Sequence, residues 1–275
     1  MRYSPQLDST SKTDSTIEQL RWHEKKRYRI PVIAAVLLTA LVSYAIFNYD
    51  TLPSSESIYR AISERDFDEA LRLLDEAEEF DEKTGVGFDS DWIQAERGYI
   101  YLQTGEFKLA IANLTASIDA APENPSTYQN RGLAYERSGD IENAESDFSS
   151  AISLDSSNFT RFQERGMLYY NTGRAELAID DFNRAIELAP DVPGLLFKRA
   201  YAFNDAGDPG AAIRDANQLL EMAPENPRGY LARGVAELML GNIDVGLSDL
   251  DSALALDPPE EMRVAIEIMR ASLID

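Results

Sequence analysis

The clearest chemical pattern in the chain is an arginine and an aspartate that recur together. The arginines return at one constant interval, at Arg97, Arg131, Arg165, Arg199 and Arg233. The aspartates keep the same interval, each at a fixed distance after an arginine, at Asp147, Asp181, Asp215 and Asp249. A guanidinium binds a carboxylate through two parallel hydrogen bonds, either inside the protein or on an acidic ligand. Because the aspartates keep the arginine interval and the protein is itself acidic, we favour pairing on packed helices over a ladder that grips an acidic ligand. Asn113 replaces the aspartate after Arg97, so we expect that pair to be weaker.

Residue types that carry catalysis are scarce. The sequence has no cysteine and one histidine, His23, which excludes disulfides and thiolate metal sites. It holds no glycine-rich phosphate loop, no Gly-x-Ser-x-Gly elbow and no metal-ligand spacing. We interpret the acidic pairs Asp180-Asp181 and Glu260-Glu261 as solvated helix faces. The sequence therefore predicts no enzyme, no cofactor and no metal site.

The arginines belong to a longer motif that repeats at the same interval. Each is followed by a small residue, then an aromatic, a turn glycine, an alanine and a bulky apolar residue, and most units end in proline. In the second unit these are Gly132, Tyr135, Gly139, Ala144 and Phe148. The motif resembles the tetratricopeptide repeat (TPR), whose period is about 34 residues, over residues 91–260, as five units. The resemblance implies two helices joined by a tight turn in each unit. Neither helix can bury its apolar stripe alone, so the units must stack.

We therefore expect an all-α fold, a TPR α-solenoid that forms a right-handed superhelix, preceded by a single transmembrane helix and containing no strands. A degenerate helical pair with Arg65-Asp66 at its turn caps one end, and Asp81 to Ser90 is expected to be a loop. The predicted segments are a polar and basic tail at 1–29, a transmembrane helix at 30–48, the capping pair at 51–84, repeats at 91–124, 125–158, 159–192, 193–226 and 227–260, and a capping helix at 261–275.

The predicted membrane segment is the apolar run from Ile30 to Phe47, which contains no charged residue and is just long enough to span a bilayer as a helix. Residues 21–29 place five basic and two aromatic side chains directly before it, which is typical of a membrane interface. A cleaved signal peptide or a buried core helix are the alternatives, but the run is longer than a signal usually needs. We favour an uncleaved anchor with its amino terminus in the cytoplasm and the repeats on the other side, in the periplasm if the membrane is a bacterial inner membrane.

Composition limits the partners. The net charge is −22 for the whole chain, and residues 1–29 are net basic, so the remainder is more acidic still. Such a body is repelled by nucleic acid and by anionic lipid headgroups. We expect a protein partner with a neutral or basic segment, no nucleic acid and no small-molecule substrate, and contact with the lipid bilayer only through residues 30–48.

The family resemblance also places a binding groove on the concave face, lined by the first helix of each unit. Residues at the matching positions are rich in aromatic and amide side chains, which give adaptable contacts to a bound segment, although several could simply pack between units. They are Trp92, Tyr99, Gln129, Asn130, Leu133, Gln163, Met167, Tyr170, Asn171, Phe197, Lys198, Tyr201, Asn204, Leu231 and Val235. The lysine and asparagine pair with which some family members clamp a terminal carboxylate is absent.

We therefore predict a membrane-anchored protein-interaction scaffold that binds a partner polypeptide, in cell-envelope assembly, secretion or chaperoning. Two alternatives stay open. One is an architectural spacer that associates with itself, and the other is an accessory subunit of an envelope enzyme complex.

Overall fold

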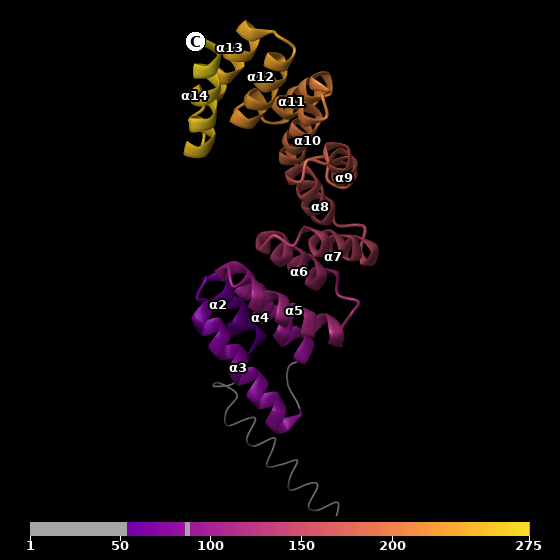
Figure 1. The fold of residues 1–275 in the computed structure, drawn as a ribbon. Helices are drawn as coiled ribbons and strands as arrows, with labels where there is room; N and C mark the ends of the chain where they lie inside the picture. The colour runs from indigo at the N-terminus through magenta and orange to yellow at the C-terminus, as the bar shows by residue number, and fades with distance from the viewer. Residues whose placement is uncertain (1–53, 86–88, 275) are drawn as a thin grey trace, which may run out of the picture. The chain divides into compact units, whose positions relative to one another are not determined.

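A computed structural model describes residues 54–85 and 89–274, and the regular secondary structure in these ranges is entirely helical (Figure 1). The helices are α2 (Ser55–Ser63), α3 (Phe67–Thr84), α4 (Ser90–Thr104), α5 (Phe107–Ala120), α6 (Pro125–Ser138), α7 (Ile141–Leu154), α8 (Phe159–Asn171), α9 (Ala175–Leu188), α10 (Pro193–Asp205), α11 (Pro209–Met222), α12 (Pro227–Met239), α13 (Ile243–Ala255) and α14 (Glu260–Ile274). The all-α solenoid expected from the sequence is confirmed. The chain divides into residues 1–60 and residues 61–275, and the packing described below is that of the second unit.

The predicted anchor at 30–48 and the tail at 1–29 lie outside the described residues. Among the helices that are described, none combines the length and the apolar character that crossing a membrane requires.

Local chemistry explains where the helices begin and end. Asp140 accepts a hydrogen bond from the backbone N–H of Asn143 at 3.3 Å and so caps the start of α7. Prolines open α6, α10, α11 and α12, where a missing N–H costs nothing. Gly139 ends α6 with φ 88°, a left-handed conformation that strains other residues. The turn between the two helices of a repeat therefore follows from its sequence.

Within a repeat, the small residue lets the two helices approach closely. A Cβ atom added at Gly132 of α6 would lie 2.8 Å from Cε1 of Phe148 on α7, closer than atoms can pack. Gly166 and Phe182 repeat this arrangement in α8 and α9, at 2.9 Å. Phe148 and Phe182 are both fully buried. The glycine and the phenylalanine of the motif are thus two halves of one contact.

Between repeats, the second helix of one unit packs on the first helix of the next, as α5 does on α6 and α9 on α10. First helices also neighbour one another, α4 with α6, α8 with α10 and α10 with α12.

The ends of the described solenoid differ from its regular units. Arg65 takes φ 60° at the turn before α3, the conformation that glycine takes in the regular repeats. The prediction of a loop from Asp81 was wrong in part, because α3 continues to Thr84 and ends at Gly85 with φ 63°. At the other end α14 packs on α13, with Ile266 fully buried and Met262 and Met269 against the same cluster.

Candidate functional site

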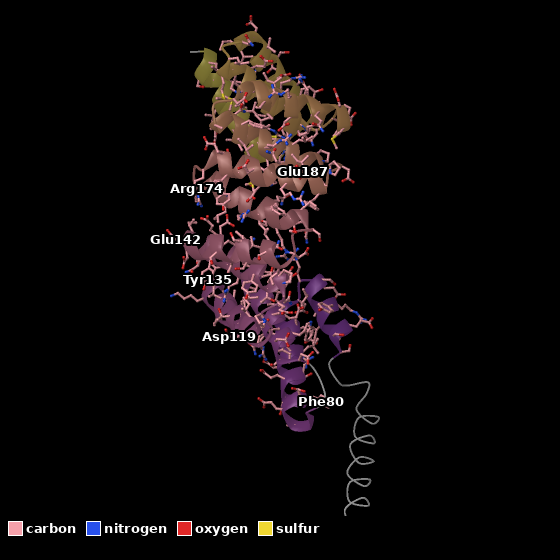
Figure 2. All side chains as sticks on the ribbon, turned by 90° about the vertical axis from the view of Figure 1, so that its right-hand side faces the viewer. Phe80, Asp119, Tyr135, Glu142, Arg174 and Glu187 are labelled. Carbon is pink, nitrogen blue, oxygen red and sulfur yellow. The ribbon has the colours of Figure 1, made fainter. Side chains whose placement is uncertain are left out.

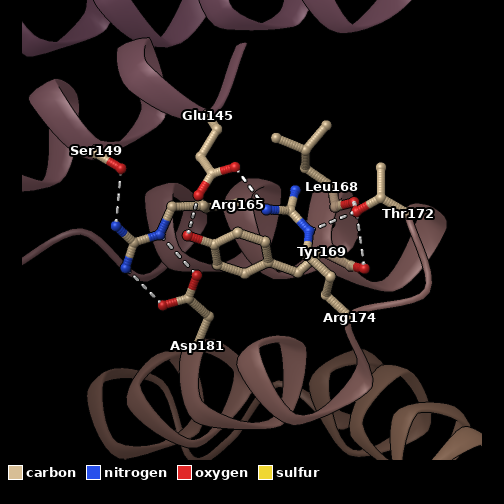
Figure 3. Close-up of polar contacts among 8 residues, drawn as sticks. All are labelled: Glu145, Ser149, Arg165, Leu168, Tyr169, Thr172, Arg174 and Asp181. Carbon is tan, nitrogen blue, oxygen red and sulfur yellow. Dashed lines mark hydrogen bonds and ion pairs between the residues drawn. The ribbon is translucent and has the colours of Figure 1, made fainter. Parts of the chain in front are cut away.

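The recurring arginines and aspartates pair inside the protein. Arg165 on α8 donates two hydrogen bonds to Asp181 on α9, each 2.8 Å long, and the Asp181 side chain is 7% exposed (Figure 3). The third guanidinium nitrogen of Arg165, Nη1, donates to Oγ of Ser149 on α7, in the preceding repeat, at 3.1 Å. Three other arginine and aspartate pairs form the same two hydrogen bonds: Arg131 with Asp147, Arg199 with Asp215 and Arg233 with Asp249. The structural interpretation of the ladder is therefore confirmed, and these guanidiniums are already occupied.

The link to the preceding repeat was missed from the sequence. The acceptors are polar residues that recur at the repeat interval, and that interval could have revealed them. They are Thr115, Ser149, Asn183 and Asn217. Each arginine therefore ties its own repeat to the second helix of the repeat before it.

Two details of the arginine and aspartate predictions need correction. Arg97 does not use Asn113 at all: it binds Asp75 at 2.5 Å and Glu78 at 2.6 Å, both on α3. The Asn113 amide instead donates to the backbone carbonyl of Leu109. Asp180 is exposed as expected of a solvated face, but its neighbour Asp181 is buried, because the helix turns it toward Arg165.

A second polar network joins the repeats at the junction of α7 and α8. Glu145 accepts from the Tyr169 hydroxyl at 3.1 Å and from Nη1 of Arg174 at 2.6 Å (Figure 3). The Arg174 guanidinium also lies 4.6 Å from the centre of the Tyr169 ring, within the range of a cation–π contact. Because the Tyr169 ring also lies 5.7 Å from the Arg165 guanidinium, this network adjoins the arginine ladder, and we interpret it as holding the repeats together.

The predicted groove residues stand on the first helices, and we call the surface they share the first-helix face. It is made of side chains on α4, α6, α8, α10 and α12. Most of the predicted residues are half-buried. Those are Trp92, Tyr99, Gln129, Asn130, Leu133, Gln163, Met167, Tyr170, Phe197, Lys198, Tyr201 and Val235.

The other three predicted residues differ in exposure, and some of the set serve the core. Asn171 is exposed, whereas Leu231 and Asn204 are buried. Leu231 belongs to the hydrophobic cluster beneath α14, and Leu133 packs against buried residues of two neighbouring clusters. Packing between repeats therefore accounts for part of the predicted lining.

Aromatic side chains gather on α8 and α10. The rings of Phe197 and Tyr201 lie 4.7 Å apart, and the guanidinium of Arg228 lies 5.7 Å from the centre of the Phe197 ring. Burial raises the pKa of Tyr201 to about 12, and the neighbouring Tyr170 adds to this shift. Burial also raises the pKa of Tyr170, to which Asp205 contributes. Both hydroxyls therefore stay protonated at neutral pH.

Asn204, on α10 one helical turn after Tyr201, has an unusual environment. Its side chain is 5% exposed, yet neither its amide nitrogen nor its amide oxygen has a hydrogen-bond partner in the described part of the chain. Tyr170, at the same position of the preceding repeat, interacts with Asp205 on the next first helix. The residue that corresponds to Asp205 one repeat later is Met239, whose thioether donates no hydrogen bond. The repeat thus leaves one buried amide without its partner.

Three charged residues of this face were missed from the sequence. They are Glu136 on α6, Glu164 on α8 and Arg228 on α12. Glu164 lies one repeat after the predicted Asn130 and one repeat before Lys198, and Glu136 lies one repeat before Tyr170. The repeat interval would therefore have found both glutamates. No group of acidic or histidine side chains within the described ranges could hold a metal ion.

Comparisons with known proteins agree with the fold. Models described as tetratricopeptide repeat or TPR repeat match residues 98–139, 125–158, 161–192 and 197–261. No curated protein matches the chain.

Solved structures show the same architecture at low sequence identity. A tetratricopeptide repeat protein from Parabacteroides merdae has a TM-score of 0.66 and 19% identity, covering 82% of this chain and 87% of its own. MamA has a TM-score of 0.56 and 22% identity, covering 61% and 92%. YrrB, described as a TPR protein with an unusual peptide-binding site, has a TM-score of 0.55 and 18% identity, covering 65% and 92%. At these identities the likeness is one of fold. Residues 98–261 thus form an array of tetratricopeptide repeats, and the chain belongs to that family.

Proposed function

We propose that the chain is a protein-interaction scaffold whose first-helix face binds an extended segment of a partner polypeptide. The observation that carries this proposal is the Asn204 amide, which is buried beside Tyr201 with its donor and its acceptor unused. A buried amide without hydrogen-bond partners destabilises the folded protein by about 1–3 kcal/mol. We take its presence as a sign that the amide forms hydrogen bonds to a bound ligand. A peptide group offers one N–H and one C=O, which match the two free groups of Asn204.

The surroundings of Asn204 suit such a ligand. The Phe197 and Tyr201 rings are half-buried and supply apolar contact area beside the amide. The amide is buried in the free protein, so a bound segment must displace a covering side chain to reach it. Met239 occupies the position that corresponds to Asp205 one repeat on, and its unbranched side chain, 51% exposed, is free to change rotamer. The description of YrrB as peptide-binding supports this proposal for the fold that the two chains share.

The proposal is tested with a pool of short random peptides, acetylated and amidated, passed over the immobilised full chain. We expect retention of a subset by the unchanged protein, and its loss in the variants Asn204→Ala and Phe197→Ala/Tyr201→Ala. Leu177→Ala on α9 serves as the control, because Leu177 is 45% exposed on a second helix. Retention that is equal in all variants, or no retention at all, would overturn the proposal.

We also propose that residues 30–48 hold the protein in a membrane as a single span, with residues 1–29 in the cytoplasm and the repeats on the opposite side. The uncharged run and the basic cluster before it support this topology. In a bacterium, protease added outside intact spheroplasts should then digest the repeats. Full protection of the repeats would reject the topology.

The architectural alternative has one observation in its favour. The turn after α12 exposes Leu240 to 52%, and the first residues of α13 expose Ile243 and Val245 to 39% and 50%. Sedimentation of the purified chain distinguishes the two functions. Concentration-dependent assembly that persists in the Asn204→Ala variant favours a spacer that associates through this end.

A further inference from the structure

The last described helix, α14, packs on the solenoid with one face and leaves the opposite face exposed. Its inner face lies against α13, where Ile266 is fully buried (Figure 1). On the opposite face Val264 is 43% exposed, and Ile268, at 66%, is the most exposed of the large apolar side chains that the structure describes. We call this surface the α14 outer face. It consists of five uncharged and exposed residues, which are Val264, Ala265, Ile268, Ala271 and Ser272.

The repeat shows what kind of element packs on such a face. α14 continues the register of the first helices, because Ile268 lies one repeat interval after Gly234 of α12. A Cβ atom added at Gly234 would lie 3.2 Å from Cβ of Asp249 and 3.2 Å from Cδ2 of Leu250, both on α13. In each of the five regular repeats the second helix packs on the first. The face that α14 exposes is therefore the face on which every regular first helix binds another α-helix.

Two positions of α14 change the helix that this face can accept. Gly234 allows α13 to approach closely, whereas the larger Ile268 side chain keeps an incoming helix farther away. Arg233 binds Asp249 on α13, whereas the residue one repeat interval later is Glu267, of the opposite charge. A second helix of the regular repeat would therefore meet a bulky side chain in place of a glycine and a like charge in place of an ion pair.

The charge at this position favours a basic partner. Glu267 is exposed, and it forms no ion pair with any residue that the structure describes. The two arginines of α14 point elsewhere, since Arg263 binds Asp257 and Arg270 binds Asp251. A lysine or arginine on an incoming helix could therefore pair with Glu267 without displacing an existing partner.

The same charges disfavour a second copy of the chain. Successive helices joined by a tight turn run antiparallel, and an antiparallel pair of α14 helices would bring the same edge of each helix together. That edge carries Glu260 and Glu267, so glutamates would face glutamates. The net charge of −22 adds a general repulsion between copies.

We infer that the α14 outer face binds an amphipathic α-helix of a partner protein. The apolar stripe of that helix covers Val264 and Ile268, with a small residue opposite Ile268, and a lysine or arginine beside the stripe pairs with Glu267. This inference goes beyond the proposed function, because it concerns a surface that the first-helix face does not include. A chain with both surfaces could hold two partner segments at once.

The experiment uses a library of helical peptides of about 20 residues, which is long enough for an isolated helix to form. Each peptide has leucine and alanine at the spacing of one helix face and either lysine or glutamate, in equal amounts, at the positions beside it. The library is passed over the immobilised full chain. Retained peptides should carry lysine over glutamate about fivefold beside the stripe, the ratio that ~1 kcal/mol of ion pairing gives.

Two variants test the two parts of the inference. Glu267→Arg should reverse the preference from lysine to glutamate, and Ile268→Glu should abolish retention while the circular dichroism spectrum stays helical, because Ile268 is already exposed. Glu142→Arg is the matched control, since Glu142 is exposed on α7 and is labelled in Figure 2. This control should keep the lysine preference, which separates a local ion pair from the general attraction of an acidic protein.

Several outcomes would overturn the inference. They are no retention, retention that survives in Ile268→Glu, and a lysine preference that survives in Glu267→Arg. Retention that is lost in Phe197→Ala/Tyr201→Ala would assign the helix to the first-helix face, and would support the proposed function while rejecting this inference. Sedimentation of the full chain as a dimer that Ile268→Glu dissociates would assign the α14 outer face to a second copy instead.

Discussion

Removing the aspartate of one ladder pair should destabilise the protein more than removing the pair. In Asp181→Ala the Arg165 guanidinium, whose side chain is 21% exposed in the intact pair, loses two hydrogen bonds of 2.8 Å. A buried charge that loses its partner costs ~3–5 kcal/mol. Arg165 keeps its bond to Ser149 and its position over the Tyr169 ring, 5.7 Å from the ring centre, so we expect about 2–4 kcal/mol.

The double variant Arg165→Leu/Asp181→Ala leaves no uncompensated charge. We expect it to be more stable than Asp181→Ala by about 1–2 kcal/mol, although it lacks one more native side chain. Asp180→Ala is the matched control, since Asp180 is exposed and adjacent, and it should stay within about 0.5 kcal/mol of the parent. The measurement is the urea midpoint of the helical circular dichroism signal at pH 7, with the slope checked for constancy. A double variant that is less stable than Asp181→Ala would refute the reasoning.

Three further predictions concern other parts of the structure. Gly132→Ala should destabilise by about 1–3 kcal/mol, because its Cβ would lie 2.8 Å from Phe148, whereas Gly194→Ala, with nothing within 4 Å, should be neutral or stabilising in the same urea titration. Asn204→Leu should raise the free energy of unfolding by about 1–3 kcal/mol, because it removes the unpartnered amide, and it should also reduce peptide retention. A loss of stability would show that the amide has a hydrogen-bond partner in the folded protein. Glu164→Gln should stabilise the protein at pH 7, because burial raises the pKa of Glu164 above its ordinary 4.5 and so makes the ionised carboxylate costly in the folded state. The gain in stability should shrink as pH falls through the raised pKa and vanish below about 4.5. A gain that is independent of pH in chemical denaturation would contradict this.

The fold could be predicted well from the sequence, because the same packing contact recurs in successive repeats. Gly132 with Phe148 and Gly166 with Phe182 are one contact in two copies, and the arginine and aspartate ladder follows the same interval. A single sequence therefore contained the comparison that normally needs several related ones. The prediction was wrong for Arg97, because α3 offers Asp75 and Glu78 there and α3 lies outside the regular interval.

The site was harder to predict, because it depends on departures from the repeat. Glu136 and Glu164 occupy positions at which other units have Tyr170 or Lys198, and the structure half-buries both carboxylates. The Asn204 amide lacks a partner, and the position that would hold the counterpart of Asp205 one repeat later is Met239. Sequence periodicity identifies such positions, but their chemistry depends on neighbours in space.

The central claim is that the first-helix face holds another polypeptide, and site-specific photocrosslinking in the cells that make the protein tests it most directly. p-Benzoyl-phenylalanine would replace Tyr201 in one variant and Leu177, on the second helix α9, in another. We predict a crosslinked protein adduct from position 201 that disappears when Asn204→Ala is added, and none from position 177. No adduct from position 201, or equal adducts from both positions, would contradict the account.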